Sequence, residues 1–136
     1  MALQSSQLAY AVIGAAIEVH RHLGPGLLES AYQACLQREL TRLAVPFVPE
    51  MPVPVTYKGE LVNCQFRVDL MVEQSLLVEV KSVERVLPIH VAQILTYLRL
   101  TNATQALLIN FNVPILRQGV RSFLPARDAD HPPRSA

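Results

Sequence analysis

The clearest pattern in the chain is an alternation of apolar and polar residues over positions 66–81, which predicts two β-strands joined by a polar turn at 73–75. With this three-residue turn, Asp69 lies opposite Glu79. One face of the pair is then entirely apolar, with Phe66, Val68, Leu70, Val72, Leu76, Val78 and Val80. A two-residue turn would shift the pairing by one residue and bring Asp69 onto that apolar face, so we favour the first register.

Apolar residues recurring at helical spacing predict two helices near the N-terminus, over residues 5–22 and 27–43. Gly24-Pro25-Gly26 separates them. Because this connection is short, we expect the two helices to form a hairpin.

A third helix is predicted to begin at Pro88 and to run to about Leu100. Most of its residues are apolar, so we expect it to be buried on most sides. Its polar residues His90, Gln93 and Tyr97 are spaced so that they share one face.

The residues between the second and third helices favour strands. Four prolines between positions 46 and 54 exclude a helix there and fit edge or irregular strands. We expect strands over 53–57 and 61–72, joined by a turn at Lys58-Gly59, and a buried strand over 104–110. The order α, α, β, β, β, α, β predicts an α/β fold (an α+β mixed sheet) with helices packed on the sheet.

Chain length predicts one domain, over residues 1–124, followed by a polar, proline-rich tail over 125–136 that we expect to be disordered. Cys35 and Cys64 lack the spacing of a zinc site or a disulfide framework. No apolar run reaches the length of a membrane span. We therefore expect a soluble, cytoplasmic protein.

The predicted strand pair places two carboxylates face to face, which destabilises a sheet unless a cation lies between them. Asp69 and Glu79, with the carbonyl oxygen of Val80, offer the oxygen ligands that Mg²⁺ or Mn²⁺ prefers. Lys81, on the same face, can polarise a water molecule or stabilise charge on a phosphate. These are the parts needed for metal-assisted hydrolysis of a phosphodiester. The alternative is an exposed sheet face on which Asp69 pairs with Arg67 or Lys81.

Composition bears on this chemistry in two ways. Only Lys58 and Lys81 are lysines among the 12 basic residues, so a lysine beside the carboxylates is informative, because arginine cannot change its protonation state. The net charge of +1 gives no strong overall attraction to nucleic acid, and Arg67 is a candidate for a local phosphate contact. Apolar residues make up 51% of the chain and charged residues 17%, which suggests a buried partner surface and a homodimer.

Two motifs resemble a known family. Asp69, then Glu79-Val80-Lys81, then a helix with Gln93 and Tyr97, resemble the core of the PD-(D/E)XK nuclease superfamily. Residues 26–32, Gly-Leu-Leu-Glu-Ser-Ala-Tyr, resemble the signature of the GxxExxY proteins, a small, mostly bacterial family placed in that superfamily. Val68 stands where the superfamily's name has proline.

The resemblance implies a restriction-endonuclease-like core, a central mixed sheet flanked by helices. It implies that Asp69 and Glu79 bind the metal, that Lys81 is the catalytic lysine, and that Glu29 is directed at the metal site from the second helix. By the same resemblance, Gln93 and Tyr97 line the cleft. We also assign Tyr32 and Arg67 to the cleft and its substrate contacts.

These observations favour a Mg²⁺-dependent nuclease that acts on DNA or RNA. The alternative is a non-catalytic binding or scaffold module, a homodimer that keeps the cleft. Metal-dependent hydrolysis of a small phosphate ester is a third, weaker interpretation.

Overall fold

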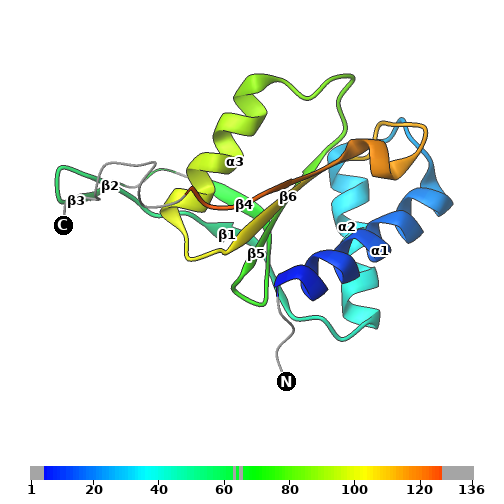
Figure 1. Cartoon of the computed structure of the whole chain (residues 1–136), viewed down its shortest axis with the longest axis horizontal. Coiled ribbons are helices and arrows are strands. Elements are labelled where there is room, and N and C mark those ends of the chain that lie inside the picture. The colour runs from blue at the N-terminus through cyan, green and yellow to red at the C-terminus, as the bar shows by residue number, and fades with distance from the viewer. Residues whose placement is uncertain (1–4, 63, 65, 127–136) are drawn as a thin grey trace.

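A five-stranded mixed sheet, in the order β1-β4-β5-β6-β7, forms the centre of the molecule (Figure 1). The computed structural model describes residues 5–62, 64 and 66–126. The strands of this sheet are β1 Phe47–Pro52, β4 Arg67–Val72, β5 Leu76–Lys81, β6 Gln105–Asn110 and β7 Val120–Phe123. Among the described strand pairs, only β5 and β6 are parallel, because the chain crosses between them through a helix.

The two sides of the sheet are covered by different helices (Figure 1). Helices α1, Ser5–Leu23, and α2, Glu29–Arg42, pack on one side against a core that includes Leu70, Val78 and Ile109. Helix α3, Pro88–Leu100, packs on the other side against Met71, Leu77 and Leu108. Both faces of β5 and β6 are therefore buried, which fits their nearly continuous apolar sequences.

The predicted register of the carboxylate-bearing strands is confirmed. Leu70 pairs with Val78, and Val72 pairs with Leu76 across the turn at 73–75. The three predicted helices and the predicted α/β fold with a mixed sheet are also confirmed.

The predicted strand over 61–72 is wrong in its extent. It is divided into β3, Glu60–Val62, and β4, and only β4 joins the main sheet. β3 pairs instead with β2, Val55–Tyr57, through a turn in which Lys58 and Gly59 both have positive φ. In Figure 1 this hairpin lies at one end of the molecule, beyond β1 and β4. The predicted order left out β1 and β7, which are the edges of the main sheet. β1 lies in the proline-containing segment that was expected to form edge or irregular strands, and this expectation is confirmed.

Val68 is another departure, because it packs on the α3 side and not with Leu70. Regular alternation would place both residues on one face. The pairing between β1 and β4 is interrupted beside this point, where Glu50 has a φ of 51°. The strand is thus locally irregular next to Asp69.

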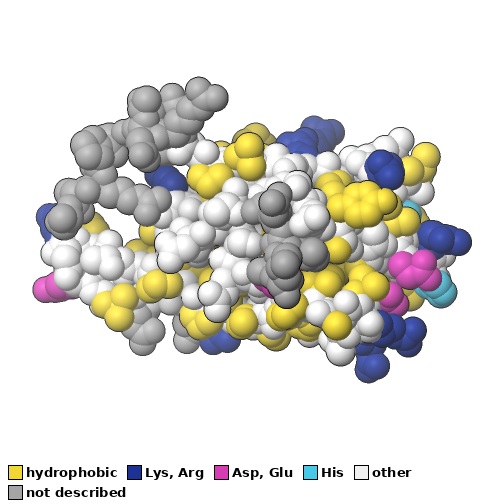
Figure 2. Space-filling model, turned by 60° about the horizontal axis from the view of Figure 1, so that its bottom comes forward, with side chains coloured by type: hydrophobic (Ala, Val, Ile, Leu, Met, Phe, Trp, Pro, Cys, Tyr) yellow, Lys and Arg dark blue, Asp and Glu magenta, His cyan; other side chains and the backbone are white. Residues whose placement is uncertain are grey.

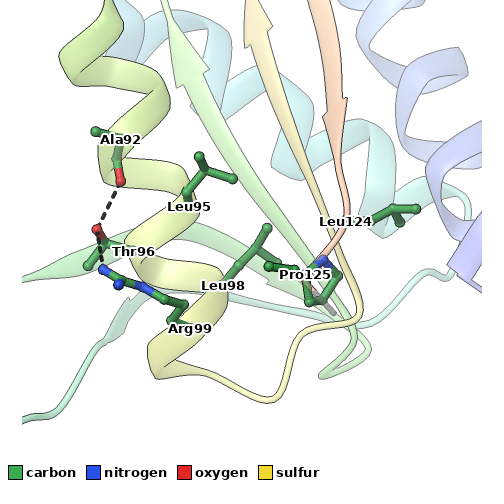
Figure 3. Close-up of a pocket in the computed structure, with 8 residues that line it drawn as sticks. Ala92, Leu95, Thr96, Leu98, Arg99, Leu124 and Pro125 are labelled. Atoms are coloured by element: carbon green, nitrogen blue, oxygen red, sulfur yellow. Dashed lines mark hydrogen bonds between the residues drawn. The ribbon is translucent and has the colours of Figure 1, made fainter. Parts of the chain in front are cut away.

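Burial of α3 on most sides is also contradicted. Only Ile94, Tyr97 and Leu98 are buried, whereas Ile89 is 67% exposed and Leu95 is 41% exposed. The outer face of α3 borders an open, largely apolar pocket of about 400 Å³ together with the segment after β7 (Figure 3). The pocket is lined by Ala92, Leu95, Thr96, Leu98, Arg99, Leu124, Pro125 and Ala126.

The predicted tail has two described residues, Pro125 and Ala126, and the rest, residues 127–136, lies outside the described part of the chain. None of the helices within the described ranges combines the length and the hydrophobicity needed to cross a bilayer.

Candidate active site

The two carboxylates lie where the regular pairing of β4 and β5 stops. That pairing ends at Leu70 and Val78. One residue further, the Asp69 backbone N–H donates to Glu79 Oε1 at 3.0 Å, and the Val80 N–H donates to Asp69 Oδ2 at 2.7 Å. The carboxylate oxygens thus take the place of main-chain acceptors between the two strands. The sequence prediction that Asp69 and Glu79 face each other is confirmed.

Burial and repulsion make this pair hard to ionise fully. Glu79 is only 6% exposed, and its burial, followed by the charge of Asp69, raises its pKa to about 8. Burial also raises the pKa of Asp69, and the charges of Glu50 and Glu29 act in the same direction. Because the two groups titrate together, the pair retains a proton near neutral pH when no cation lies beside it.

Lys81 and the Val80 carbonyl lie at the same end of β5. Lys81 is half-buried, and its charge lowers the pKa of both Asp69 and Glu79, yet no ion pair involves Lys81 in the part of the chain described. The Val80 N–H points toward Asp69, and in an extended strand the carbonyl of the same residue points to the same side. Two carboxylates, one carbonyl and one ammonium group are therefore gathered around one strand end.

The N-terminus of α2 is held against this strand end. Ser82, which follows Lys81, donates its N–H to Glu29 Oε2 at 3.5 Å and its hydroxyl to the Leu27 carbonyl oxygen. Glu29 is exposed in the first turn of α2, and its charge helps to raise the pKa of Asp69. The structure thus brings Glu29 close to the carboxylate pair. Its role as a metal ligand remains a prediction.

Tyr32 does not line the cleft, which corrects the sequence-based assignment. It is fully buried, and its ring stacks on Phe111 with centroids 4.5 Å apart. Its hydroxyl donates to the Gly24 carbonyl oxygen at 2.6 Å and accepts from the Leu27 N–H at 3.1 Å. Tyr32 therefore fixes the loop that leads into α2, and this explains structurally why a tyrosine stands three residues after Glu29.

Of the three predicted polar residues on helix α3, Tyr97 lies near the carboxylates and Gln93 contacts Tyr97. Gln93 Nε2 donates to the Tyr97 hydroxyl at 3.0 Å. Burial and then the charge of Glu79 raise the pKa of Tyr97, which places its ring near the pair. His90 has a different task, because its Nδ1 accepts the Leu87 N–H at 3.0 Å and so caps the start of the helix.

Two residues beside Asp69 were not predicted. Gln33, one turn after Glu29 on α2, donates Nε2 to Glu50 Oε1 at 2.9 Å and to the Asp69 carbonyl oxygen at 3.2 Å. Glu50 stands on β1, at the interruption in its pairing with β4. The i, i+4 spacing of Glu29 and Gln33 was a signal for Gln33. Nothing in the local sequence reveals Glu50, because the pairing partner of β1 is set by tertiary structure.

Asn110, at the end of β6, was also not predicted. Its side chain is buried, accepts the Val83 N–H at 3.0 Å and donates to the Val83 carbonyl oxygen at 2.9 Å. These two bonds fix the chain just beyond Lys81 and Ser82. Asn110 thus anchors the exit of the strand that carries Glu79 and Lys81.

Asp69 and Glu79 form a close pair, and the other acidic side chains near them do not complete a preformed metal site. Within the described ranges, no group of three or more His, Cys, Asp or Glu side chains is arranged to hold a metal ion. Arg67, the first residue of β4, is exposed two residues before Asp69, and its contact with a substrate remains a prediction.

Comparison with known proteins gives one family. A family model described as PD-(D/E)XK nuclease superfamily matches residues 6–123. A search of curated proteins finds no match. A solved structure titled "Crystal structure of SSO0001" is similar, with 19% identity and a TM-score of 0.46. The similarity covers 92% of this chain and 64% of that one, so the chain spans less than two thirds of that protein.

Proposed function

The chain belongs to the PD-(D/E)XK nuclease superfamily, and we propose that it is a metal-dependent nuclease that hydrolyses phosphodiester bonds of DNA or RNA. Its mixed sheet flanked by helices is of the restriction-endonuclease-like type. The observation that carries the proposal is the buried Asp69–Glu79 pair with Lys81 at the same strand end.

A divalent cation suits these residues. Even with Lys81 nearby, burial and mutual repulsion raise the pKa of both Asp69 and Glu79, so the pair is not fully compensated, and a hard cation with oxygen ligands would compensate it. Asp69, Glu79 and the Val80 carbonyl would hold Mg²⁺ or Mn²⁺, with Glu29 nearby. When bound, such an ion acts as a Lewis acid and lowers the pKa of a water ligand.

The chain's own groups account for the remaining tasks. Lys81 would orient the attacking water or stabilise the charge that builds on the phosphate, because its ammonium group is compact and close to both carboxylates. Gln33 fixes the backbone of Asp69, and Asn110 fixes the backbone beyond Lys81. Gln93 and Tyr97 would border the cleft on the α3 side, and Arg67 would contact a phosphate of the substrate.

Cleavage of labelled single- and double-stranded DNA and RNA, with Mg²⁺ or Mn²⁺, tests the function. We expect Asp69→Asn and Lys81→Ala to lower cleavage by about 100-fold or more, since each removes a group that acts on the developing charge. Glu60→Gln on the distant β2–β3 hairpin removes one carboxylate as a control and should retain activity. Equal cleavage by wild type and Lys81→Ala would show that the activity belongs to a contaminant or to another site.

Two finer assignments are part of this proposal. The first is that the chain is a GxxExxY protein, which residues 26–32 favour, and the bonds of Tyr32 and Ser82 to this loop support a structural reason for the motif. The exposed apolar side chains on the outer face of α3 support a homodimer. Light scattering should give twice the chain mass, and Leu95→Glu should give the monomer. A monomeric wild type would contradict the dimer and leave the nuclease proposal intact.

A non-catalytic binding or scaffold role is the outcome if wild type binds nucleic acid and metal but cuts none of these substrates. The intact Asp69, Glu79 and Lys81 favour the enzyme over this alternative.

A further inference from the structure

A groove is lined by residues of α2 and by Phe47 at the start of β1, and it lies outside the carboxylate pair. Its cavity volume is about 510 Å³. It is lined by Ala34, Gln37, Arg38, Thr41, Arg42 and Phe47.

Two arginines supply positive charge along this groove. Arg38 and Arg42 are both exposed, and their i, i+4 spacing places them on one side of α2, about 6 Å apart along the helix axis. Neither makes a hydrogen bond or ion pair in the part of the chain that the structure describes. They also border a second groove with Glu18 and Glu39, so both charge signs occur at this end of the molecule. Figure 2 shows basic, acidic and histidine side chains gathered at one end of the face it presents.

The groove leads to Asp69 along two elements. On α2, Gln33 lies one turn before Gln37 and donates to the Asp69 carbonyl oxygen. On β1, Phe47 in the groove is three residues, about 10 Å of extended strand, from Glu50 beside Asp69. A polymer that continues from the groove along these two elements would therefore reach the carboxylates.

The charge distribution requires a binding surface of this kind. Asp69, Glu79, Glu50 and Glu29 make the site acidic, and an acidic site repels a phosphodiester. A net charge of +1 gives little overall attraction, so phosphate affinity has to come from cations near the site. Among the described residues, Arg38 and Arg42 have no hydrogen-bond or ion-pair partner, so their charges are available to supply it.

We propose that this groove binds the sugar–phosphate backbone of the substrate strand, with Arg38 and Arg42 on its phosphates, and leads that strand to Asp69. The inference rests on the proposed nuclease function and adds a substrate path to it.

The test is binding without cleavage. Fluorescence anisotropy in EDTA measures the Kd of labelled single-stranded and duplex DNA for wild type and for Arg38→Gln/Arg42→Gln. The variant should bind about tenfold or more weakly, and the slope of log K against log salt should fall by about 1.4 for the single strand, or 1.8 for the duplex. Arg38→Lys/Arg42→Lys keeps both charges and should restore most of the affinity.

Arg117→Gln/Arg121→Gln is the matched control, because it removes the same charge from exposed residues near β7, at the opposite edge of the sheet. It should bind within about twofold of wild type, since salt-dependent affinity follows the phosphates actually contacted. Equal losses of affinity in the two double variants, unchanged binding by the groove variant, or no binding by wild type would each contradict the proposal that the groove binds the substrate.

If the groove variant binds and cleaves as well as wild type, the nuclease proposal stands and only the groove proposal is rejected. If the groove variant binds more weakly but wild type cleaves none of the substrates, the groove proposal is supported and the nuclease proposal is rejected.

Discussion

At the scale of single residues, the chemistry of this molecule is concentrated on a carboxylate that has been taken out of water. Glu79 lies beneath α3 on the most buried strand pair, and its Oε1 is held by the Asp69 N–H. A backbone donor favours the ionised form, but burial and the neighbouring carboxylate outweigh it and raise the pKa of Glu79. Without a cation, the folded protein therefore favours protonated Glu79.

This preference predicts a pH-dependent stability. The folded-state pKa of about 8 lies above the usual value of 4.5, so the folded state binds the extra proton between these limits. In EDTA, the contribution of Glu79 to the free energy of unfolding should be fully present below pH 4.5, fall as pH rises through 8, and then level off. The loss is on the order of a few kcal/mol. Glu79→Gln should flatten the profile in thermal unfolding, whereas Glu60→Gln should not. A wild-type profile that rises from pH 5 to 8 would contradict the raised pKa.

Local sequence predicts residues of this site unequally. Asp69, Glu79 and Lys81 follow from the alternation of one hairpin, because side-chain period and turn length fix which residues face each other. Glu50 could not be found, since it comes beside Asp69 only through the pairing of β1 with β4. Tyr32 was assigned to the cleft because position in a motif does not distinguish a substrate contact from a side chain that fixes a loop.

At the scale of elements, the loop before α2 joins the helical hairpin to the active strand. Gly24 and Gly26 have φ values of 67° and 101°, which residues with a side chain rarely adopt. The Tyr32 hydroxyl makes hydrogen bonds to Gly24 and Leu27 of this loop. The Ser82 hydroxyl, just after β5, makes another to Leu27. The position of Glu29 therefore depends on a loop that has little burial of its own.

Removing the Tyr32 hydroxyl tests this dependence. Tyr32→Phe keeps the stack on Phe111 but leaves the Leu27 N–H and the Gly24 carbonyl without their partner. We expect the free energy of unfolding, measured with urea, to fall by roughly 1–3 kcal/mol. Tyr10 is 81% exposed, so Tyr10→Phe is the matched control and should change stability by less than about 0.5 kcal/mol. Equal stability of the two variants would mean that the hydroxyl does not hold the loop.

Elements with strong internal patterns were predicted well, and those that depend on distant partners were not. The helix from Pro88 to Leu100 has the predicted bounds, because proline and apolar periodicity are local signals. Its burial was overestimated, since an apolar composition does not reveal which side lacks a covering element. The break between β3 and β4 was missed because residues 60–72 carry no proline or glycine that would interrupt a strand.

At the scale of the whole molecule, a cation that binds the folded state should stabilise every element that the site connects. Asp69 and Glu79 join β4 to β5, Gln33 joins α2 to β4, and Asn110 joins β6 to the chain after β5. The unfolded chain does not hold these groups together. Binding of the cation should therefore stabilise all of these elements together against unfolding.

Saturating Mn²⁺ should raise the thermal unfolding midpoint of wild type at pH 8, with a stabilisation of about 2.7 kcal/mol when the metal concentration is 100 times its Kd. The shift should be smaller at pH 5, because protons compete for the same carboxylates. Asp69→Asn and Glu79→Gln should lose the shift, and Glu60→Gln should keep it. If Glu79→Gln shifts as much as wild type, the metal binds elsewhere, and the exposed Glu18–His22 pair at the end of α1 is then the site to mutate. Loss of the shift in Glu79→Gln and its decrease at low pH, taken together, would link the buried pair to the metal by two independent measurements.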